Sequence, residues 1–188
     1  MTTTPLSVPT PAVPQTDHAT RAGVTTRLAS RPDADRIEAM HARCSATSLY
    51  HRFHAPLPCV SSRLVRQLVA PPGGWSLVAE HAGEVVGFAC AGAVSSFEVE
   101  VGVLVEDRHQ RNGIGTRLLH QTALEACRRG YLSLQLLTMP ENDRLLGTVQ
   151  AAGLLGHATW QDGLLCVSAS VRRLAPLAFV DDHLPRPA

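Results

Sequence analysis

Residues 97–105 read Phe-Glu-Val-Glu-Val-Gly-Val-Leu-Val, so apolar and polar positions alternate along the segment. This period of two is typical of a β-strand, here with valines on one face and Glu98 and Glu100 on the other. A glycine-containing turn follows, and a helix is expected over residues 114–129, ended by Gly130. A strand that feeds such a turn and helix directs backbone N–H groups and the positive end of a helix dipole at one point. We therefore expect a phosphate- or pyrophosphate-binding site at this turn.

The remaining patterns predict an α/β protein with a mixed, largely antiparallel central sheet flanked by about four helices. Three hairpin-like connections require antiparallel neighbours, whereas helices between strands allow parallel ones. Further strands are expected at residues 24–28, 75–80, 85–94, 131–138, 154–160 and 164–171, and further helices at about 37–44, 64–69 and 141–152. We expect one domain over residues 24–175, with flexible tails over residues 1–23 and 176–188.

Composition and charge argue against several classes of partner. The 188 residues carry a formal net charge of +1, which gives no broad electrostatic footprint for nucleic acid or for an anionic membrane. The apolar runs are too short to span a bilayer, and residues 1–15 lack the apolar core of a signal peptide. The five cysteines are widely spaced, without the close pairs of a zinc site, so free thiols and no metal are expected. A cytoplasmic protein is therefore predicted.

The turn at residues 110–115 reads Gln-Arg-Asn-Gly-Ile-Gly, which can be compared with known phosphate-binding motifs. A dinucleotide-binding motif needs a third glycine where Leu118 stands, and a P-loop needs a lysine, which the sequence lacks altogether. The pattern that fits is Gln/Arg-x-x-Gly-x-Gly/Ala, which resembles the acyl-coenzyme-A loop of the GNAT superfamily of N-acetyltransferases. Gly113 and Gly115 suit this loop because a side chain would block the approach of phosphate oxygens.

The resemblance extends over residues 24–171, where the expected order of strands and helices is that of the GNAT fold. Pro140-Glu141-Asn142 resembles the Asn-bearing segment of the family's fourth helix. The stretches at residues 31–35 and 45–53 are similar to one branch of the superfamily, the bacterial protein-lysine acetyltransferases of the Pat type.

A set of coenzyme-binding residues is implied by this resemblance. They lie on the end of the alternating strand, in the loop and before the last helix: Val103, Leu104, Val105, Arg111, Asn112, Gly113, Ile114, Gly115, Thr116 and Asn142. Arg108, Arg111 and Arg117 are candidate contacts to the coenzyme's phosphates, although solvated charges are the simpler interpretation of Arg108 and Arg117.

The resemblance also implies a function, which is the transfer of an acetyl group from acetyl-coenzyme A to a primary amine in a ternary complex. A protein lysine is the expected acceptor, and a small-molecule amine is the alternative acceptor. A non-catalytic module that binds acyl-coenzyme A and regulates is the alternative function. The expected partners are acetyl-coenzyme A and the amine, without nucleic acid or membrane, and homodimer formation is left open.

The chemistry of acyl transfer requires a base, because a lysine amine has a reference pKa of about 10.4 and is mostly protonated at neutral pH. Glu100 stands where Pat-like relatives carry their general base, and Glu98 on the same face is the reserve candidate. A backbone N–H within residues 103–105 could donate to the thioester oxygen as negative charge develops. Many GNAT enzymes carry, at the position of Val149, a tyrosine that acts as the general acid and protonates the leaving thiolate. In this chain water is left to do so.

Overall fold

The computed structural model describes residues 23–142 and 144–174, which form one seven-stranded sheet in the order β1-β2-β3-β4-β5-β7-β6. The strands are β1 (Val24–Leu28), β2 (Trp75–His81), β3 (Glu84–Ala93), β4 (Glu98–Val105), β5 (Ser133–Thr138), β6 (Leu155–Gln161) and β7 (Leu164–Ser170). Every neighbouring pair is antiparallel except β4 and β5. The expected mixed, largely antiparallel sheet is thereby confirmed. The expected tails lie outside the described residues, apart from Gly23.

The described chain contains five α-helices where about four were expected. They are α1 (Ala34–Ala42), α2 (Ala46–Phe53), α3 (Ser62–Val69), α4 (Ile114–Arg128) and α5 (Arg144–Ala151). The additional helix is α2, which is separate from α1 because Ser45 is an extended N-cap residue whose hydroxyl accepts a hydrogen bond from the backbone N–H of Ser48 at 3.2 Å. No helix in residues 23–142 and 144–174 is long and apolar enough to cross a membrane.

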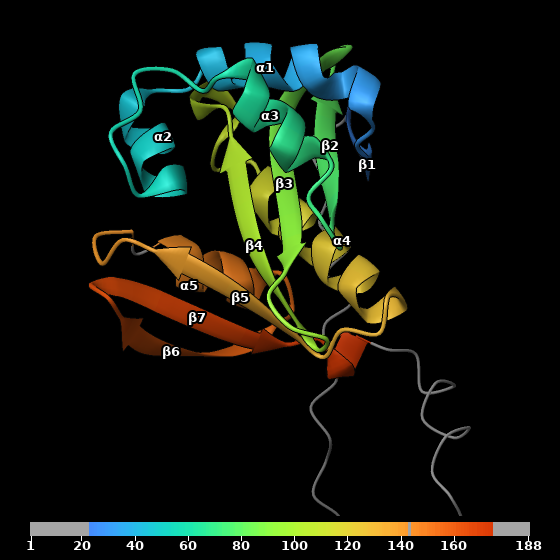
Figure 1. Cartoon of the computed structure of the whole chain (residues 1–188), viewed down its shortest axis with the longest axis vertical. Helices are drawn as coiled ribbons and strands as arrows, with labels where there is room; N and C mark the ends of the chain where they lie inside the picture. The colour runs from blue at the N-terminus through green and yellow to red at the C-terminus, as the bar shows by residue number, and fades with distance from the viewer. Residues whose placement is uncertain (1–22, 143, 175–188) are drawn as a thin grey trace, which may run out of the picture.

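The helices cover both faces of the sheet (Figure 1). On one face, Leu118 and Leu119 of α4 are fully buried in a core that includes Val101 of β4. On the other face, Met40 of α1 packs in a second core with Phe88 of β3. Burying a side chain of this size stabilises the fold by roughly 1.5–3 kcal/mol. The central strands therefore lie between two apolar layers, and a binding site can form only where the strands end.

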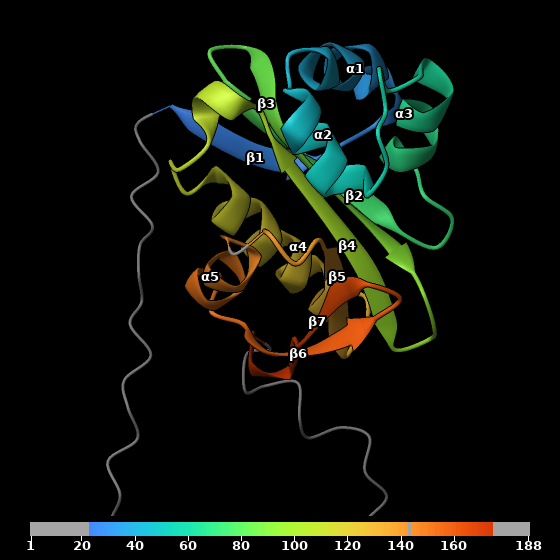
Figure 2. The same cartoon turned by 90° about the vertical axis from the view of Figure 1, so that its left-hand side faces the viewer.

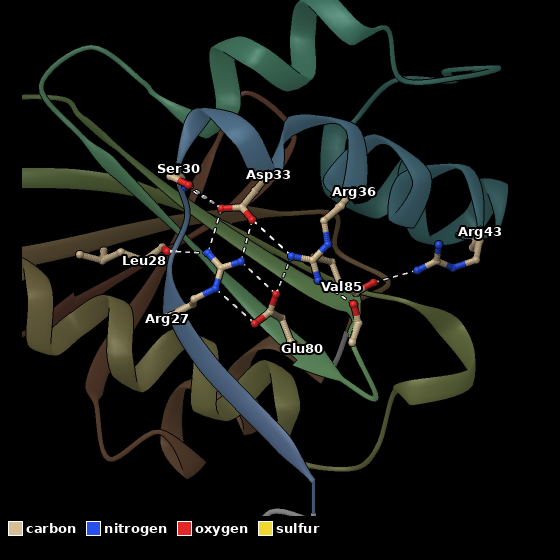
Figure 3. Close-up of polar contacts among 9 residues, drawn as sticks. Arg27, Leu28, Ser30, Asp33, Arg36, Arg43, Glu80 and Val85 are labelled. Carbon is tan, nitrogen blue, oxygen red and sulfur yellow. Dashed lines mark hydrogen bonds and ion pairs between the residues drawn. The ribbon is translucent and has the colours of Figure 1, made fainter.

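A network of ion pairs fixes the start of the domain (Figure 3). The Arg27 guanidinium donates to both carboxylate oxygens of Asp33, at 2.6 and 2.8 Å, and also to Glu80. Arg36 of α1 lies 2.7 Å from the Glu80 carboxylate. Asp33 also accepts from the N–H and the hydroxyl of Ser30, and the bonds from Arg27 first, then those from Ser30, hold the pKa of its carboxyl well below the usual range. The network joins β1, α1 and β2 through side chains.

Strands β4 and β5 diverge soon after they meet. Their parallel pairing is limited to Glu98–Ser133, Val99–Leu134 and Glu100–Gln135. Beyond this short contact β4 continues toward the loop at residues 110–115, while β5 turns away from β4. Figures 1 and 2 show α2 over the opening between the two strands. Because the strands diverge, residues 101–105 of β4 have no partner strand on the β5 side in the described part of the chain.

Candidate functional site

A cavity of about 500 Å³ lies between the end of β4, the first turn of α4, α2 and the start of α5. It brings together residues that the sequence analysis proposed as a set: Val103, Leu104, Val105, Arg111, Gly113, Ile114, Gly115, Thr116 and Asn142. Asn112 of the proposed set does not line the cavity. Its side-chain amide instead donates to the His109 carbonyl at 3.2 Å, which closes the loop on itself.

The first turn of α4 supplies backbone donors to this cavity. Gly113 is the N-cap residue and has a φ of +75°, which favours glycine, and its carbonyl accepts the helical bond from the Arg117 N–H at 2.9 Å. The N–H groups of Ile114, Gly115 and Thr116 come before the first residue that can donate within the helix. Together with the helix dipole they make the N-terminus of this 15-residue helix a site for an anion.

Arginine side chains at the cavity differ from those expected. Arg111 lines the cavity as predicted, and Arg144 at the start of α5, which the sequence analysis missed, lines it too. Arg108 and Arg117 do not. Arg108 pairs with Glu84 and Glu106, and Arg117 donates to the Val24 carbonyl at 2.9 Å and to the Thr26 hydroxyl. Neither arginine lines the cavity, and neither is simply a solvated charge, because Arg108 pairs with the buried carboxylate of Glu106 and Arg117 is held by residues of β1.

The backbone of β4 presents a donor to the opening. The hydrogen bonds from Val94 N–H to the Glu98 carbonyl and from Glu106 N–H to the Val86 carbonyl show that even-numbered residues of β4 face β3. By this alternation the N–H of Leu104 is directed at β3, whereas the N–H groups of Val103 and Val105 are directed at the gap left by β5. Leu104 is thus excluded as a donor to a bound thioester.

The two candidate bases have different surroundings. Glu100 lines a second, smaller cavity of about 70 Å³, which shares the walls formed by Arg52 and Val103 with the large cavity. Glu98 is half-buried, accepts a hydrogen bond from the Ser133 hydroxyl at 3.2 Å and does not line either cavity. Glu100 is therefore the carboxylate that faces the opening.

Helix α2 contributes side chains that the sequence analysis did not single out for the site. Arg52 and His51 line both cavities, and His54 lines the smaller one. His54 has a φ of +54°, and burial lowers its pKa, as does the nearby positive charge of Arg52. The resemblance of residues 45–53 to the Pat-type branch pointed to this segment, but it did not predict that the helix would face Glu100.

Asn142 and Val149 both fall within the helix expected at residues 141–152, but the observed helix α5 leaves Asn142 outside. In the described residues α5 begins at Arg144 rather than at 141, and Asn142 precedes it, with its side-chain amide donating to the Thr138 hydroxyl at 2.9 Å. Val149 is 2% exposed and belongs to the core below α5. No tyrosine lines either cavity, and Tyr131 donates to the Gly73 carbonyl elsewhere. In the part of the chain that the structure describes, no group of three or more His, Cys, Asp or Glu residues could hold a metal ion.

Comparisons with known proteins agree with this geometry. The family model of the acetyltransferase (GNAT) family matches residues 27–172. The crystal structure of the GNAT domain of PAT from S. lividans is 25% identical, with a TM-score of 0.72, and the match covers 78% of this chain and 90% of that one. The putative acetyltransferase yncA from Salmonella typhimurium, solved with acetyl-CoA, is 23% identical over 79% of this chain and 92% of its own, with a TM-score of 0.62.

A further solved structure is RimL, a ribosomal L7/L12 alpha-N-protein acetyltransferase in complex with coenzyme A. It is 12% identical, with a TM-score of 0.62, over 79% of this chain and 94% of its own. At this level of identity the likeness shows the fold alone. A search of curated proteins found no match to the sequence.

Proposed function

Because the chain belongs to the acetyltransferase (GNAT) family and is an acetyl-CoA-dependent N-acetyltransferase, we propose that it acetylates a primary amine by direct attack, with Glu100 as the general base. The observation that carries the proposal is the place of Glu100. Its side chain lines a small cavity that shares the wall at Val103 with the large cavity, so an amine beside Glu100 would be next to the end of a ligand bound there.

The residues of the large cavity suit the coenzyme. The N–H groups of the first turn of α4, with the guanidinium groups of Arg111 and Arg144, would hold the pyrophosphate, since together they present donors and positive charge. A Cβ at Gly115 would meet only Val105, at 3.7 Å, so the space on this side of the loop is open. The edge of β4 at Val103 would face the pantetheine arm.

The residues beside Glu100 suit the acceptor. Glu100 would take a proton from the ammonium form of the acceptor, directly or through a water, and leave a neutral nitrogen. The N–H of Val103, directed at the gap between β4 and β5, would donate to the acetyl oxygen as negative charge develops on it. Acetyl-coenzyme A supplies a thioester, so that a bond forms between the nitrogen and the acetyl carbon and the carbon–sulfur bond breaks. The nitrogen gives its second proton to water, and water protonates the departing thiolate.

We propose a protein lysine as the acceptor to test first, because the stretches at residues 31–35 and 45–53 resemble the Pat-type branch and the PAT domain is among the similar structures. The ternary-complex mechanism rests on the two adjoining cavities, which can hold coenzyme and amine together. The cytoplasmic location expected from the sequence stays a prediction, and homodimer formation stays open.

The experiment is acetyl transfer by the Glu100→Gln variant, which keeps the shape of the side chain and removes its basicity. We expect kcat to fall by at least about a hundredfold while coenzyme affinity, measured by calorimetry, hardly changes. The loss should shrink at high pH, where more of the amine is already neutral. Glu98→Gln is the matched control, since Glu98 lies outside the cavities.

Three outcomes would contradict the proposal. Full activity of Glu100→Gln at neutral pH would move the role to Glu98 or to water. Loss of activity in Glu98→Gln alone would make Glu98 the base. Tight coenzyme binding without acetylation of any amine in a wide panel would favour the regulatory module. The chain has no lysine, so acetyl label on a lysine residue can only belong to an added acceptor.

A further inference from the structure

Arg52 forms no salt bridge with a carboxylate within residues 23–142 and 144–174. The one hydrogen bond of its guanidinium runs from Nη2 to the thiol sulfur of Cys90, at 3.0 Å, and a thiol is a weak and neutral acceptor. Its Nε is buried and has no partner among the described residues. A guanidinium has five N–H donors, and the described residues accept only one hydrogen bond from that of Arg52.

The position of Arg52 is fixed by a glycine. The guanidinium lies against Gly102, where a Cβ would collide with its Cζ and both Nη atoms. Gly102 is two residues beyond Glu100 on the same face of β4, and same-face neighbours on a strand are about 7 Å apart. Arg52 and Glu100 therefore lie beside each other on one side of the sheet and line the same small cavity.

Strand β3 leaves open space next to Glu100, beside the small cavity. Gly92 of β3 pairs with Glu100, and a Cβ on Gly92 would meet no atom within 4 Å. Among the described residues, Glu100 and Arg52 are the only two fully charged ones that line the cavity. The other lining residues are a glycine, apolar residues, a threonine, an asparagine and two histidines. A molecule placed there meets one negative and one positive group a short distance apart.

Arg52 also lines the large cavity, but in the proposed binding mode the coenzyme does not provide its anion. Its phosphates have donors at the other end of the large cavity, in the first turn of α4 and in Arg111 and Arg144. The pantetheine arm and the thioester, which would come nearest to Gly102, are uncharged. An anion for Arg52 must therefore come with the acceptor or arise during the reaction.

We propose that the acceptor carries a carboxylate close to its amine, and that Arg52 binds this carboxylate while the amine lies at Glu100. The planar guanidinium matches a carboxylate with two parallel hydrogen bonds, and its fork is already held in place by Gly102 and by the ring of Phe53, 5.0 Å from Cζ. The carboxylate is that of a free amino acid or that of an Asp or Glu next to a lysine in a protein. The inference rests on the proposed function, because it names the acceptor of that same site.

The test compares acceptors in pairs that differ only in the carboxylate. One arm uses free amino acids against their carboxamides, and the other uses peptides with Asp-Lys against Asn-Lys, all with the wild-type enzyme and acetyl-CoA. We expect kcat/KM to be at least about tenfold higher for the carboxylate member in one of the two arms, and that arm identifies the source. This comparison needs no variant and so does not depend on how a variant folds.

Two arginine variants then assign the preference to Arg52. Arg52→Gln should reduce the ratio within each pair to near one, mainly by raising KM for the carboxylate member. Arg66→Gln on the exposed side of α3 is the matched control and should leave the ratio unchanged.

Several results would overturn the inference. Equal kcat/KM for both members of every pair in the wild type would do so. An equal loss of kcat for both members in Arg52→Gln would mean that Arg52 stabilises charge formed in the reaction. The absence of turnover with any amine would overturn the proposed function together with this inference, whereas turnover that ignores the carboxylate overturns the inference alone.

Discussion

The Asp107 carboxylate accepts two hydrogen bonds from Ser45, one from its backbone N–H and one from its hydroxyl, each 2.8 Å long. Ser45 is the N-cap residue of α2, and Asp107 opens the turn after β4. The Ser48 hydroxyl also donates to Asp107, and Gln110 donates both to Ser48 and to the Val105 carbonyl. The loop that leads into α4 therefore also holds α2, which carries Arg52.

Replacing Asp107 tests this coupling. Burial alone would raise the pKa of the Asp107 carboxyl, but the bonds from Ser45 and Ser48 outweigh it and hold the pKa below the usual range. We expect Asp107→Ala to lower the free energy of unfolding by about 1–2 kcal/mol, because an exposed cluster of hydrogen bonds is lost. The acceptor KM and the coenzyme dissociation constant should both rise, since α2 borders both cavities.

Asp162→Asn is the matched control for this change. Asp162 is exposed in the turn between β6 and β7 with a φ of +48°, a conformation that asparagine also adopts readily. In denaturant unfolding and in steady-state kinetics this variant should have the same stability and the same kinetic constants as the wild type. A normal acceptor KM in Asp107→Ala would show that α2 keeps its place without the bonds to Asp107.

Gly115→Asp tests the anion site at α4. The new side chain would place a carboxylate among the N–H groups that we assign to the pyrophosphate, and we expect coenzyme affinity to fall by at least about tenfold, or roughly 1.4 kcal/mol. Gly115→Ala separates the effect of the charge from that of a side chain, because among protein atoms its Cβ would meet only Val105, at an ordinary contact distance of 3.7 Å. Unchanged calorimetric affinity in a folded Gly115→Asp variant would remove this turn from the site.

Arg111 combines a strained backbone with a proposed role in binding. Its φ of +60° lies in the left-handed region, which costs an L-residue about 1–2 kcal/mol and a glycine much less. We expect Arg111→Gly to raise the free energy of unfolding by about 0.5–1 kcal/mol and to weaken coenzyme binding several-fold. Ala82→Gly, at a φ of +49° in an exposed turn, should bring a similar stabilisation without any change in affinity. Lower stability in both variants would show that neither position is strained.

The parts of the site that sequence could predict are local in the chain. The alternation before Val105 and the glycines at 113 and 115 lie within twenty residues, so their pattern alone predicts a strand, a turn and a helix end. Residues 45–53 are different, because the cap at Ser45 is completed by Asp107, 62 positions away. Likewise, Arg52 reaches the cavity only because Gly102, on a distant strand, leaves room for it. Such contacts have no periodicity and become visible only in the folded chain.

Burial of His41 predicts how stability depends on pH. The side chain on α1 is 1% exposed, its Nδ1 lies 2.8 Å from the Ile37 carbonyl, and its Nε2 has no partner in the described residues. The rings of Phe53 and Phe88 lie about 6 Å away, with centroid distances of 6.0 and 5.9 Å. Burial is the main cause that lowers the pKa of His41, and it outweighs the bond to Ile37, which raises it.

In the unfolded chain a histidine has a pKa of about 6.5, so below that pH the unfolded state binds a proton that the folded state refuses. The free energy of unfolding should therefore be highest above about pH 6.5 and fall as the pH drops toward 5, by up to about 1.4 kcal/mol per pH unit for one such group. His54 and His109, whose pKa values burial also lowers, add to the same slope. His41→Leu should make the slope between pH 5 and 6.5 shallower, whereas His157→Leu, at an exposed position of β6, should not. Urea unfolding across this range measures both, and an unchanged slope in His41→Leu would mean that the folded state accepts a proton at His41 after all.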